Sequence, residues 1–349
     1  MKINKIIFTG IFLCLAGLST LYAQSAIDYY NRGNNYDRQG NYAEAIADYN
    51  RAIEIDPNLK EAYYNRGRAY YFQRNYSKAI ADYTRAIELN PNDAAAYSNR
   101  GGAHDSLGEY ASAIADFTKA IEINPNYALP YSNRGNTYYK QGNYIQAAID
   151  YNKAIAIDPN HADTYFLRGF SRYKQSSYAQ AIVDFTRAIE LGRKDRDVYF
   201  FRGLSYSEQN NYSQAIADFT KAIELEPNNK YSYYNRGLAY SKQGSYSQAL
   251  SDFGRAIEIS PNYAEAYFNR AGVFSSLGNF SQEIGDLTRA IEINPNYTDA
   301  YERRKILYWS NKDYDKAWQD VHKLEKLGHT FHPKDRFIKE LKHASGRDK

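Results

Sequence analysis

The five residues Tyr29-Tyr30-Asn31-Arg32-Gly33 recur along the chain and decide its architecture. An arginine returns every 34 residues without insertion or deletion, at Arg32, Arg66, Arg100, Arg134, Arg168, Arg202, Arg236, Arg270 and Arg304. A tyrosine precedes each arginine by three residues, and a glycine follows the first seven. Self-similarity at such a period is typical of a solenoid, so nine units from about Ala26 to Phe331 predict one elongated array of repeats.

Each repeat has the pattern of two helices joined by a turn. In the first unit, apolar and aromatic residues at helical spacing run from Tyr29 to Tyr36 and again from Ala45 to Ile53. The turn sequence Gln39-Gly40-Asn41-Tyr42 separates the two runs, and Asp56-Pro57-Asn58 ends the second. We therefore expect an all-α chain in which Gly33 and Ala45 face each other across an antiparallel hairpin, because two small residues allow close backbones.

The order of residues within a repeat carries a family resemblance. The second unit contains Tyr63, Gly67, Tyr70, Ala79, Tyr83, Ala86 and Pro91. This pattern resembles the tetratricopeptide repeat over residues 24–331. The resemblance implies an α-solenoid, a right-handed superhelix of stacked antiparallel helix pairs, whose concave face is lined by the first helices and binds peptides or proteins. The chaperone-tail clamp of this family is not implied, because its basic positions are Tyr30, Tyr64, Ser98 and Asn99 here.

Two charged columns depart from that family's usual pattern. Arginine stands where the family typically has leucine, and an aspartate recurs at Asp48, Asp82, Asp116, Asp150, Asp184, Asp218, Asp252, Asp286 and Asp320. Arg32 and Asp48 each lie eight residues from Gly40, and Asp48 and Arg66 are likewise symmetric about Pro57. We expect a ladder of structural ion pairs, within or between repeats, and a charged binding stripe is the alternative.

The asparagine before the arginine is a candidate ligand-binding residue. It occurs as Asn31, Asn65, Asn99, Asn133, Asn235 and Asn269. A carboxamide both donates and accepts, so a row of them on the inner face could pair with any peptide backbone. Similar asparagine ladders hold extended peptides in some long superhelices of the family. The alternative is that asparagine merely suits a solvated helix face.

Apolar residues interrupt this ladder in the fifth and sixth repeats. The inner helices there carry Phe166, Leu167, Phe170, Phe200, Phe201 and Leu204. An exposed cluster of this kind would mark an interaction site. We expect a partner segment whose backbone follows the asparagines and whose apolar anchor lies near Phe200. The alternative is that a small rotation of the helices buries these side chains between repeats.

Composition narrows the classes of function. The formal net charge is +4 over 349 residues, and the repeats lack the basic stripe that phosphate binding needs, so we expect no nucleic-acid partner. No phosphate loop or nucleophile-plus-base arrangement stands apart from the repeat, so we expect no catalytic residues and no cofactor. Histidines at His322, His329, His332 and His343 could suggest a metal, but in a basic tail solvated side chains are the simpler interpretation.

The two ends of the chain differ from the repeats. Residues 1–23 combine Lys2 and Lys5 with an apolar run and a small residue at Ala23, which is the layout of a secretory signal peptide cleaved after Ala23. The alternative is a membrane anchor over residues 6–23. Residues 332–349 are expected to form a helix that covers the last repeat, followed by a basic tail, with a membrane-surface role as the alternative.

Together these features predict an exported, non-enzymatic protein-interaction scaffold that binds an extended peptide or protein segment on its concave face. One alternative is a structural subunit of a secreted or envelope-associated assembly. Another is an accessory or carbohydrate-binding module, which the 37 tyrosines would favour if many lined the groove. Membrane contact is expected only through an uncleaved leader or the C-terminal helix.

Overall fold

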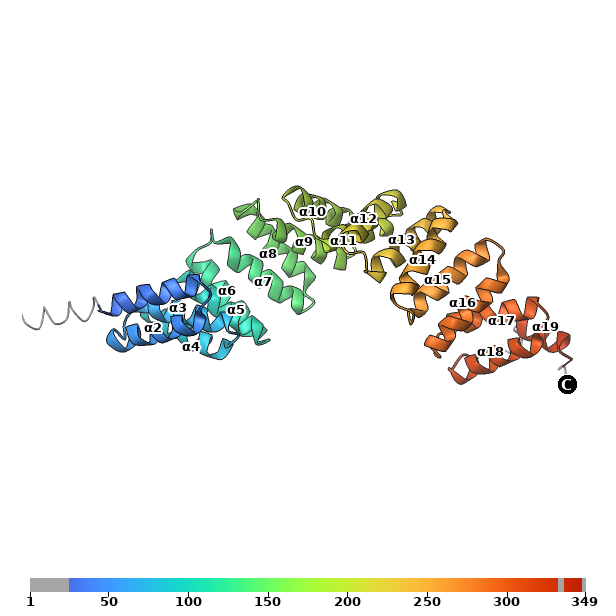
Figure 1. The fold of residues 1–349 in the computed structure, drawn as a ribbon, viewed down its shortest axis with the longest axis horizontal. Helices are drawn as coiled ribbons and strands as arrows, with labels where there is room; N and C mark the ends of the chain where they lie inside the picture. The colour runs from blue at the N-terminus through green and yellow to red at the C-terminus, as the bar shows by residue number, and fades with distance from the viewer. Residues whose placement is uncertain (1–24, 332–335, 347–349) are drawn as a thin grey trace, which may run out of the picture. The chain divides into compact units, whose positions relative to one another are not determined.

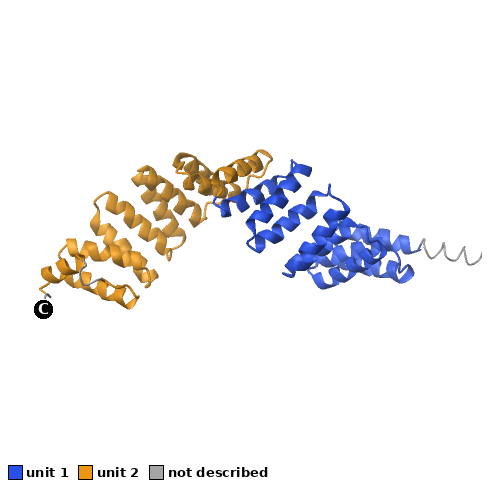
Figure 2. Ribbon diagram, turned by 180° about the vertical axis from the view of Figure 1, so that it is seen from behind, with its two compact units in different colours: residues 1–176 blue, residues 177–349 orange. Residues whose placement is uncertain are grey.

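The computed structural model describes residues 25–331 and 336–346, and every regular element in these ranges is an α-helix (Figure 1). The expected signal peptide at residues 1–23 lies outside the described residues. The chain divides into two compact units, residues 1–176 (unit 1) and 177–349 (unit 2), which Figure 2 distinguishes by colour. None of the helices in the described ranges is long and apolar enough to cross a membrane.

The helices follow the predicted period of two per repeat. Unit 1 contains the helix over residues 25–38 and then α2 (Tyr42–Ile55), α3 (Lys60–Phe72), α4 (Tyr76–Leu89), α5 (Ala94–Ser106), α6 (Tyr110–Ile123), α7 (Ala128–Lys140), α8 (Tyr144–Ile157) and α9 (Ala162–Lys174). Unit 2 contains α10 (Tyr178–Glu190), α11 (Arg196–Glu208), α12 (Tyr212–Leu225), α13 (Lys230–Gln243), α14 (Tyr246–Ile259), α15 (Ala264–Ser276), α16 (Phe280–Ile293), α17 (Thr298–Ser310), α18 (Tyr314–Lys326) and α19 (Arg336–Ala344). Odd-numbered helices up to α17 are the first helices of their repeats.

The two helices of a repeat approach closely where the sequence provides small residues. A Cβ atom added to Gly33 would lie 2.7 Å from Cε1 of Tyr49 and 3.3 Å from the carbonyl oxygen of Ala45. Tyr49 and Ala45 are fully buried. The expected apposition of Gly33 and Ala45 is therefore confirmed, and the same contact recurs between Gly101 and Ala113.

Each hairpin turn contains one residue with a left-handed backbone. The φ angle is positive at Gly40, Arg74, Gly108, Gly142, Ser176, Asn210, Gly244, Gly278 and Lys312. Glycine adopts this conformation without steric cost, whereas a residue with a Cβ atom is strained there. The turn geometry is thus kept even in repeats that lack the glycine.

The arginine column joins the two helices of each repeat. The guanidinium Nε and Nη2 atoms donate to both carboxylate oxygens of the aspartate sixteen residues later, at distances of 2.6–3.0 Å. These pairs are Arg32–Asp48, Arg66–Asp82, Arg100–Asp116, Arg134–Asp150, Arg202–Asp218, Arg236–Asp252, Arg270–Asp286 and Arg304–Asp320. The ion pairs therefore lie within repeats, which the symmetry of the sequence left open.

Seven arginines of this column also bond to the preceding repeat. Their third nitrogen, Nη1, donates to a side-chain oxygen on the second helix of that repeat at 2.6–3.1 Å. The acceptors are Asn50, Thr84, Thr118, Asn152, Thr186, Thr220 and Thr288. Six of these guanidinium groups, those of Arg66, Arg100, Arg134, Arg202, Arg236 and Arg304, also bind an aspartate of their own repeat and so connect three helices. The column is therefore structural.

The last helix packs against the final repeat. Ile338 and Leu341 of α19 are buried in a cluster with Ala317 and Val321 of α18. Trp309 and Phe337 pack against the same cluster, with their ring centroids 6.0 Å apart. The apolar face expected for this helix is therefore turned toward protein.

Candidate functional site

The candidate site is a groove in unit 1 formed by two adjoining pockets on its first helices. The Ser98 pocket has a volume of about 180 Å³ and is lined by Arg68, Tyr71, Phe72, Tyr83, Ser98, Asn99, Gly102 and Asn133. The Asn136 pocket has a volume of about 400 Å³ and is lined by Tyr71, Gly102, Asp105, Phe117, Asn133, Asn136, Tyr139, Lys140 and Leu167. Tyr71, Gly102 and Asn133 line both pockets, so the groove runs across successive repeats.

Three predicted residues, Asn99, Asn133 and Leu167, line this groove. In the repeats that form this groove, the sequence interpretation missed the positions one and two turns further along the first helix, although it named the first of these positions in the fifth and sixth repeats as Phe170 and Leu204. Asn133, Asn136 and Lys140 show the spacing: residues i, i+3 and i+7 share one helical face. Along this face, the position two residues after the repeat arginine holds the most varied side chains. That variation was the feature of the sequence that could have indicated a ligand-contacting position.

The asparagine column is partly engaged in bonds between repeats. Asn65, Asn99 and Asn269 donate from Nδ2 to the hydroxyl of a tyrosine in the preceding repeat, at 3.1, 2.8 and 2.9 Å. The acceptors are Tyr30, Tyr64 and Tyr234. Burial raises the pKa of Tyr64, and the hydrogen bond from Asn99 opposes that increase. In these repeats the carboxamide joins neighbouring repeats, and that of Asn99 also lines the groove.

Asn133 differs from the other asparagines of the groove. Its carboxamide makes no hydrogen bond to any residue of the described ranges, although its backbone carbonyl accepts from Oγ1 of Thr137. The preceding repeat has Ser98 where the first, second and seventh repeats have tyrosine, and a serine side chain is too short to reach. Asn235 instead donates to the carbonyl of Tyr231 at 2.8 Å, and Asn31 is exposed in the first repeat.

The charged side chains of the groove are paired. Arg68 bonds to the buried carboxylate of Asp37 in the preceding repeat. Lys140 donates to Oδ2 of Asp105 at 2.5 Å, and Thr137 donates to Oδ1 of the same carboxylate at 2.9 Å. A ligand of this groove therefore meets hydrogen-bonding and aromatic groups more than uncompensated charge.

The aromatic residues of the fifth and sixth repeats do not form an exposed patch. Phe166 and Phe200 are only 7% and 8% exposed, so the expectation that they would be accessible is wrong. Both stand at the repeat position of Tyr30, whose ring packs on Tyr49 of the second helix. The ring of Phe200 packs in the same way, with its centroid 5.8 Å from that of Phe219. The other residues of the predicted cluster are half-buried; they are Leu167, Phe170, Phe201 and Leu204.

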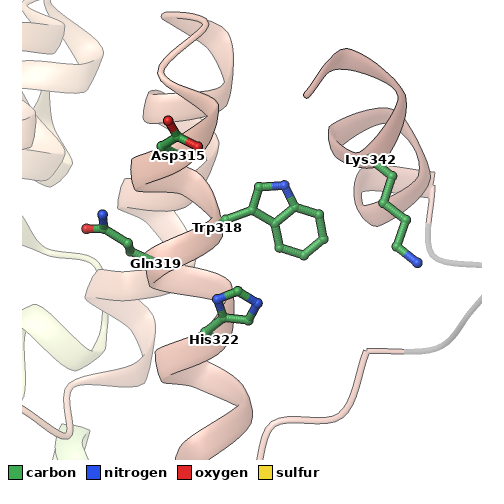
Figure 3. Close-up of a pocket in the computed structure, with 5 residues that line it drawn as sticks. All are labelled: Asp315, Trp318, Gln319, His322 and Lys342. Carbon is green, nitrogen blue, oxygen red and sulfur yellow. The ribbon is translucent and has the colours of Figure 1, made fainter. Parts of the chain in front are cut away.

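A third pocket, of about 480 Å³, lies between α18 and α19 (Figure 3). Asp315, Trp318, Gln319 and His322 project from α18, and Lys342 projects from α19. The indole of Trp318 stacks on His322 at 5.6 Å and donates from Nε1 to the hydroxyl of Ser345 at 3.1 Å. Within the described ranges, no group of three histidine, cysteine or acidic residues is placed to hold a metal ion.

Comparisons with known proteins point to one repeat family. Models described as tetratricopeptide repeat match residues 64–128, 117–148, 231–263 and 264–297, and one described as TPR repeat matches residues 33–74, 135–176 and 203–244. No curated protein matches the chain.

Solved structures agree with these matches. The chain is 27% identical to YrrB, described as a TPR protein with an unusual peptide-binding site; the match covers 54% of this chain and 97% of that one, with a TM-score of 0.50. It is also similar to the C-terminal part of a TPR repeat-containing protein from Cytophaga hutchinsonii. That match has 19% identity and a TM-score of 0.59, covers 68% of this chain and 98% of the other, and supports the fold alone.

Proposed function

Because the chain belongs to the tetratricopeptide repeat family, we propose that it is a non-enzymatic scaffold that binds an extended peptide or protein segment in the unit 1 groove. The observation that carries this proposal is the continuity of the groove. Tyr71, Gly102 and Asn133 each line both pockets, so one ligand can contact α3, α5 and α7 together. The peptide-binding site named for YrrB supports the same class of ligand.

The side chains of the groove suit recognition of a backbone. Asn133 offers a carboxamide that can donate to a peptide carbonyl and accept from a peptide N–H. Asn136 adds a second carboxamide, whose Oδ1 already accepts from the hydroxyl of Tyr151 at 2.6 Å. Tyr71 and Tyr139 add aromatic surface, which contributes strongly to binding at low cost in conformational entropy. Since Arg68 and Lys140 are already paired, binding should depend only weakly on salt.

The proposal is tested by display selection of random peptides against the full chain. Selection is repeated with Asn99→Ala/Asn133→Ala, and with Asn235→Ala/Asn269→Ala as a matched control from unit 2. Enrichment that falls with the first variant and persists with the control supports the groove. Failure to enrich any peptide would instead favour the structural-subunit alternative, and binding of oligosaccharides on a glycan array would favour the accessory module.

We further propose that the protein is exported, on the basis of the leader pattern at residues 1–23. Mass spectrometry of the mature N-terminus from fractionated cells provides the test. A chain beginning at Gln24 outside the membrane fraction supports cleavage after Ala23. An intact chain that stays in the membrane fraction supports the anchor over residues 6–23.

A further inference from the structure

A tyrosine two residues before the repeat arginine has a defined structural role in three repeats. The rings of Tyr30, Tyr64 and Tyr234 pack against the second-helix aromatic residue of their own repeat, with centroids 6.1, 5.8 and 5.9 Å apart. Their hydroxyls accept a hydrogen bond from the asparagine Nδ2 of the next repeat at 2.8–3.1 Å. The ring therefore fills the space between two first helices, and its hydroxyl satisfies an asparagine.

The third repeat lacks this ring, but the fourth repeat keeps the asparagine that would donate to its hydroxyl. Ser98 stands in the tyrosine column, and Asn133 follows it as Asn99 follows Tyr64. The carboxamide of Asn133 has no bonded partner in the described ranges. Ser98 Oγ is buried and close to the hydroxyl of Tyr127 but makes no hydrogen bond of standard geometry. The amide donor of Asn133 is thus present, but the tyrosine hydroxyl that accepts this bond in three other repeats is not.

The Ser98 pocket is open to a ligand side chain beside Gly102, although Ser98 itself is only 1% exposed. A Cβ atom added to Gly102 would meet nothing within 4 Å, so the helix surface there is uncovered. Tyr71, Phe72 and Tyr83 provide aromatic surface around this space, and Phe72 is 54% exposed. The Ser98 pocket therefore combines aromatic surroundings with one amide donor.

We propose that the Ser98 pocket is a subsite for a tyrosine side chain of the bound peptide, with Asn133 Nδ2 donating to the phenol oxygen. This inference rests on the proposed peptide binding and specifies its ligand. An aromatic ring in this pocket would pack on Tyr71, Phe72 and Tyr83. Its hydroxyl would accept from Asn133 a hydrogen bond like the one that Tyr64 accepts from Asn99. Phosphotyrosine is disfavoured, because Arg68, the cation in the lining of this pocket, is bonded to Asp37.

The test uses the full chain and a displayed library of random peptides, with wild type, Ser98→Tyr, Gly102→Leu and Gly285→Leu compared. Ser98→Tyr supplies the missing ring from the protein, and Gly102→Leu fills the same space from the neighbouring turn. Gly285 on α16 is the matched control, because a Cβ atom there also meets nothing within 4 Å. Circular dichroism verifies the helix content of each variant, and Gly102→Leu decides the outcome if Ser98→Tyr does not fold.

We expect wild type and Gly285→Leu to enrich peptides that contain tyrosine. Both filled variants should bind a selected peptide at least about 10-fold more weakly. Replacing its tyrosine by phenylalanine should weaken binding by about 5-fold, because one hydrogen bond is lost. Enrichment without tyrosine, or an unchanged tyrosine preference in a folded filled variant, would overturn the subsite and leave peptide binding standing. Absence of any enriched peptide would overturn both.

Discussion

Arg134 and Asp150 join the two helices of the fourth repeat by a bidentate ion pair, with Nε to Oδ2 at 2.8 Å and Nη2 to Oδ1 at 2.9 Å. Their side chains are 15% and 2% exposed. Removing one partner leaves a buried charge uncompensated, so Arg134→Ala or Asp150→Ala should lower the free energy of unfolding by about 3–5 kcal/mol. Replacing both, as Arg134→Met/Asp150→Leu, should restore most of that loss.

Urea denaturation followed by circular dichroism measures the four corners of this double-mutant cycle. Arg85 and Glu88 provide a control pair at 2.9 Å on an exposed helix surface, where substitutions should produce no measurable change. Strictly additive effects at Arg134 and Asp150 would contradict the coupling.

In the described part of the chain, Arg270 has no hydrogen bond from Nη1 to the preceding repeat, where Gly254 stands at the acceptor position. This glycine is in the column of Thr220 and Thr288, and a Cβ atom added there would lie 3.9 Å from Nη1 of Arg270. Gly254→Thr should therefore stabilise the protein by about 1 kcal/mol more than Gly254→Val, since valine has the same shape without the acceptor. Equal urea midpoints for the two variants would show that no bond to Arg270 forms.

Arg74 adopts a left-handed backbone with φ of 61° in the turn between α3 and α4. Glycine occupies the equivalent position in other repeats, as at Gly108 with φ of 77°. Arg74→Gly should raise the free energy of unfolding by about 0.5–1 kcal/mol, because a side chain costs about 1–2 kcal/mol in this conformation and the greater entropy of glycine in the unfolded chain offsets about half of the gain. Gly108→Ala should lower it, and thermal denaturation of both variants checks the two signs.

Gly101 and Gly102 are adjacent but should respond oppositely to alanine. A Cβ atom on Gly101 would lie 2.9 Å from Cε1 of Phe117 and 3.2 Å from the carbonyl oxygen of Ala113. Gly101→Ala should therefore cost about 1–3 kcal/mol through overpacking. Gly102→Ala faces open space and should gain about 0.5–1 kcal/mol from helix propensity. If urea midpoints shift in the same direction for both, the assignment of packing to Gly101 and of the groove to Gly102 fails.

The sequence predicted the repeat architecture well because the period determines it directly. Turn residues and apolar spacing indicated the paired helices, and the close approach of Gly33 to Ala45 followed from their equal distance to the turn. The location of the ion pairs could not be predicted, because Asp48 is placed symmetrically between two arginines. Only the folded hairpin shows that Arg32 is its partner.

The candidate site was harder to predict because its bonds connect distant columns. Whether Asn99 or Asn133 is engaged depends on a side chain 35 residues earlier, which is Tyr64 in one case and Ser98 in the other. The asparagine positions alone therefore do not reveal that Asn99 is bonded and Asn133 is not. Phe200 was assigned to an exposed cluster for a similar reason: its equivalence to Tyr30 becomes decisive only when the packing of that column is known.

The arginine column has a consequence for how such a chain can change its length. In unit 1, a repeat such as the one containing Arg134 donates from Nη1 to Thr118 on one side and offers Asn152 as an acceptor on the other. Donor and acceptor are therefore matched head to tail. A duplicated copy of 34 residues would find an acceptor for its arginine in the repeat before it and a donor for its own acceptor in the repeat after it. Gene duplication could therefore lengthen the array without changes to its interfaces.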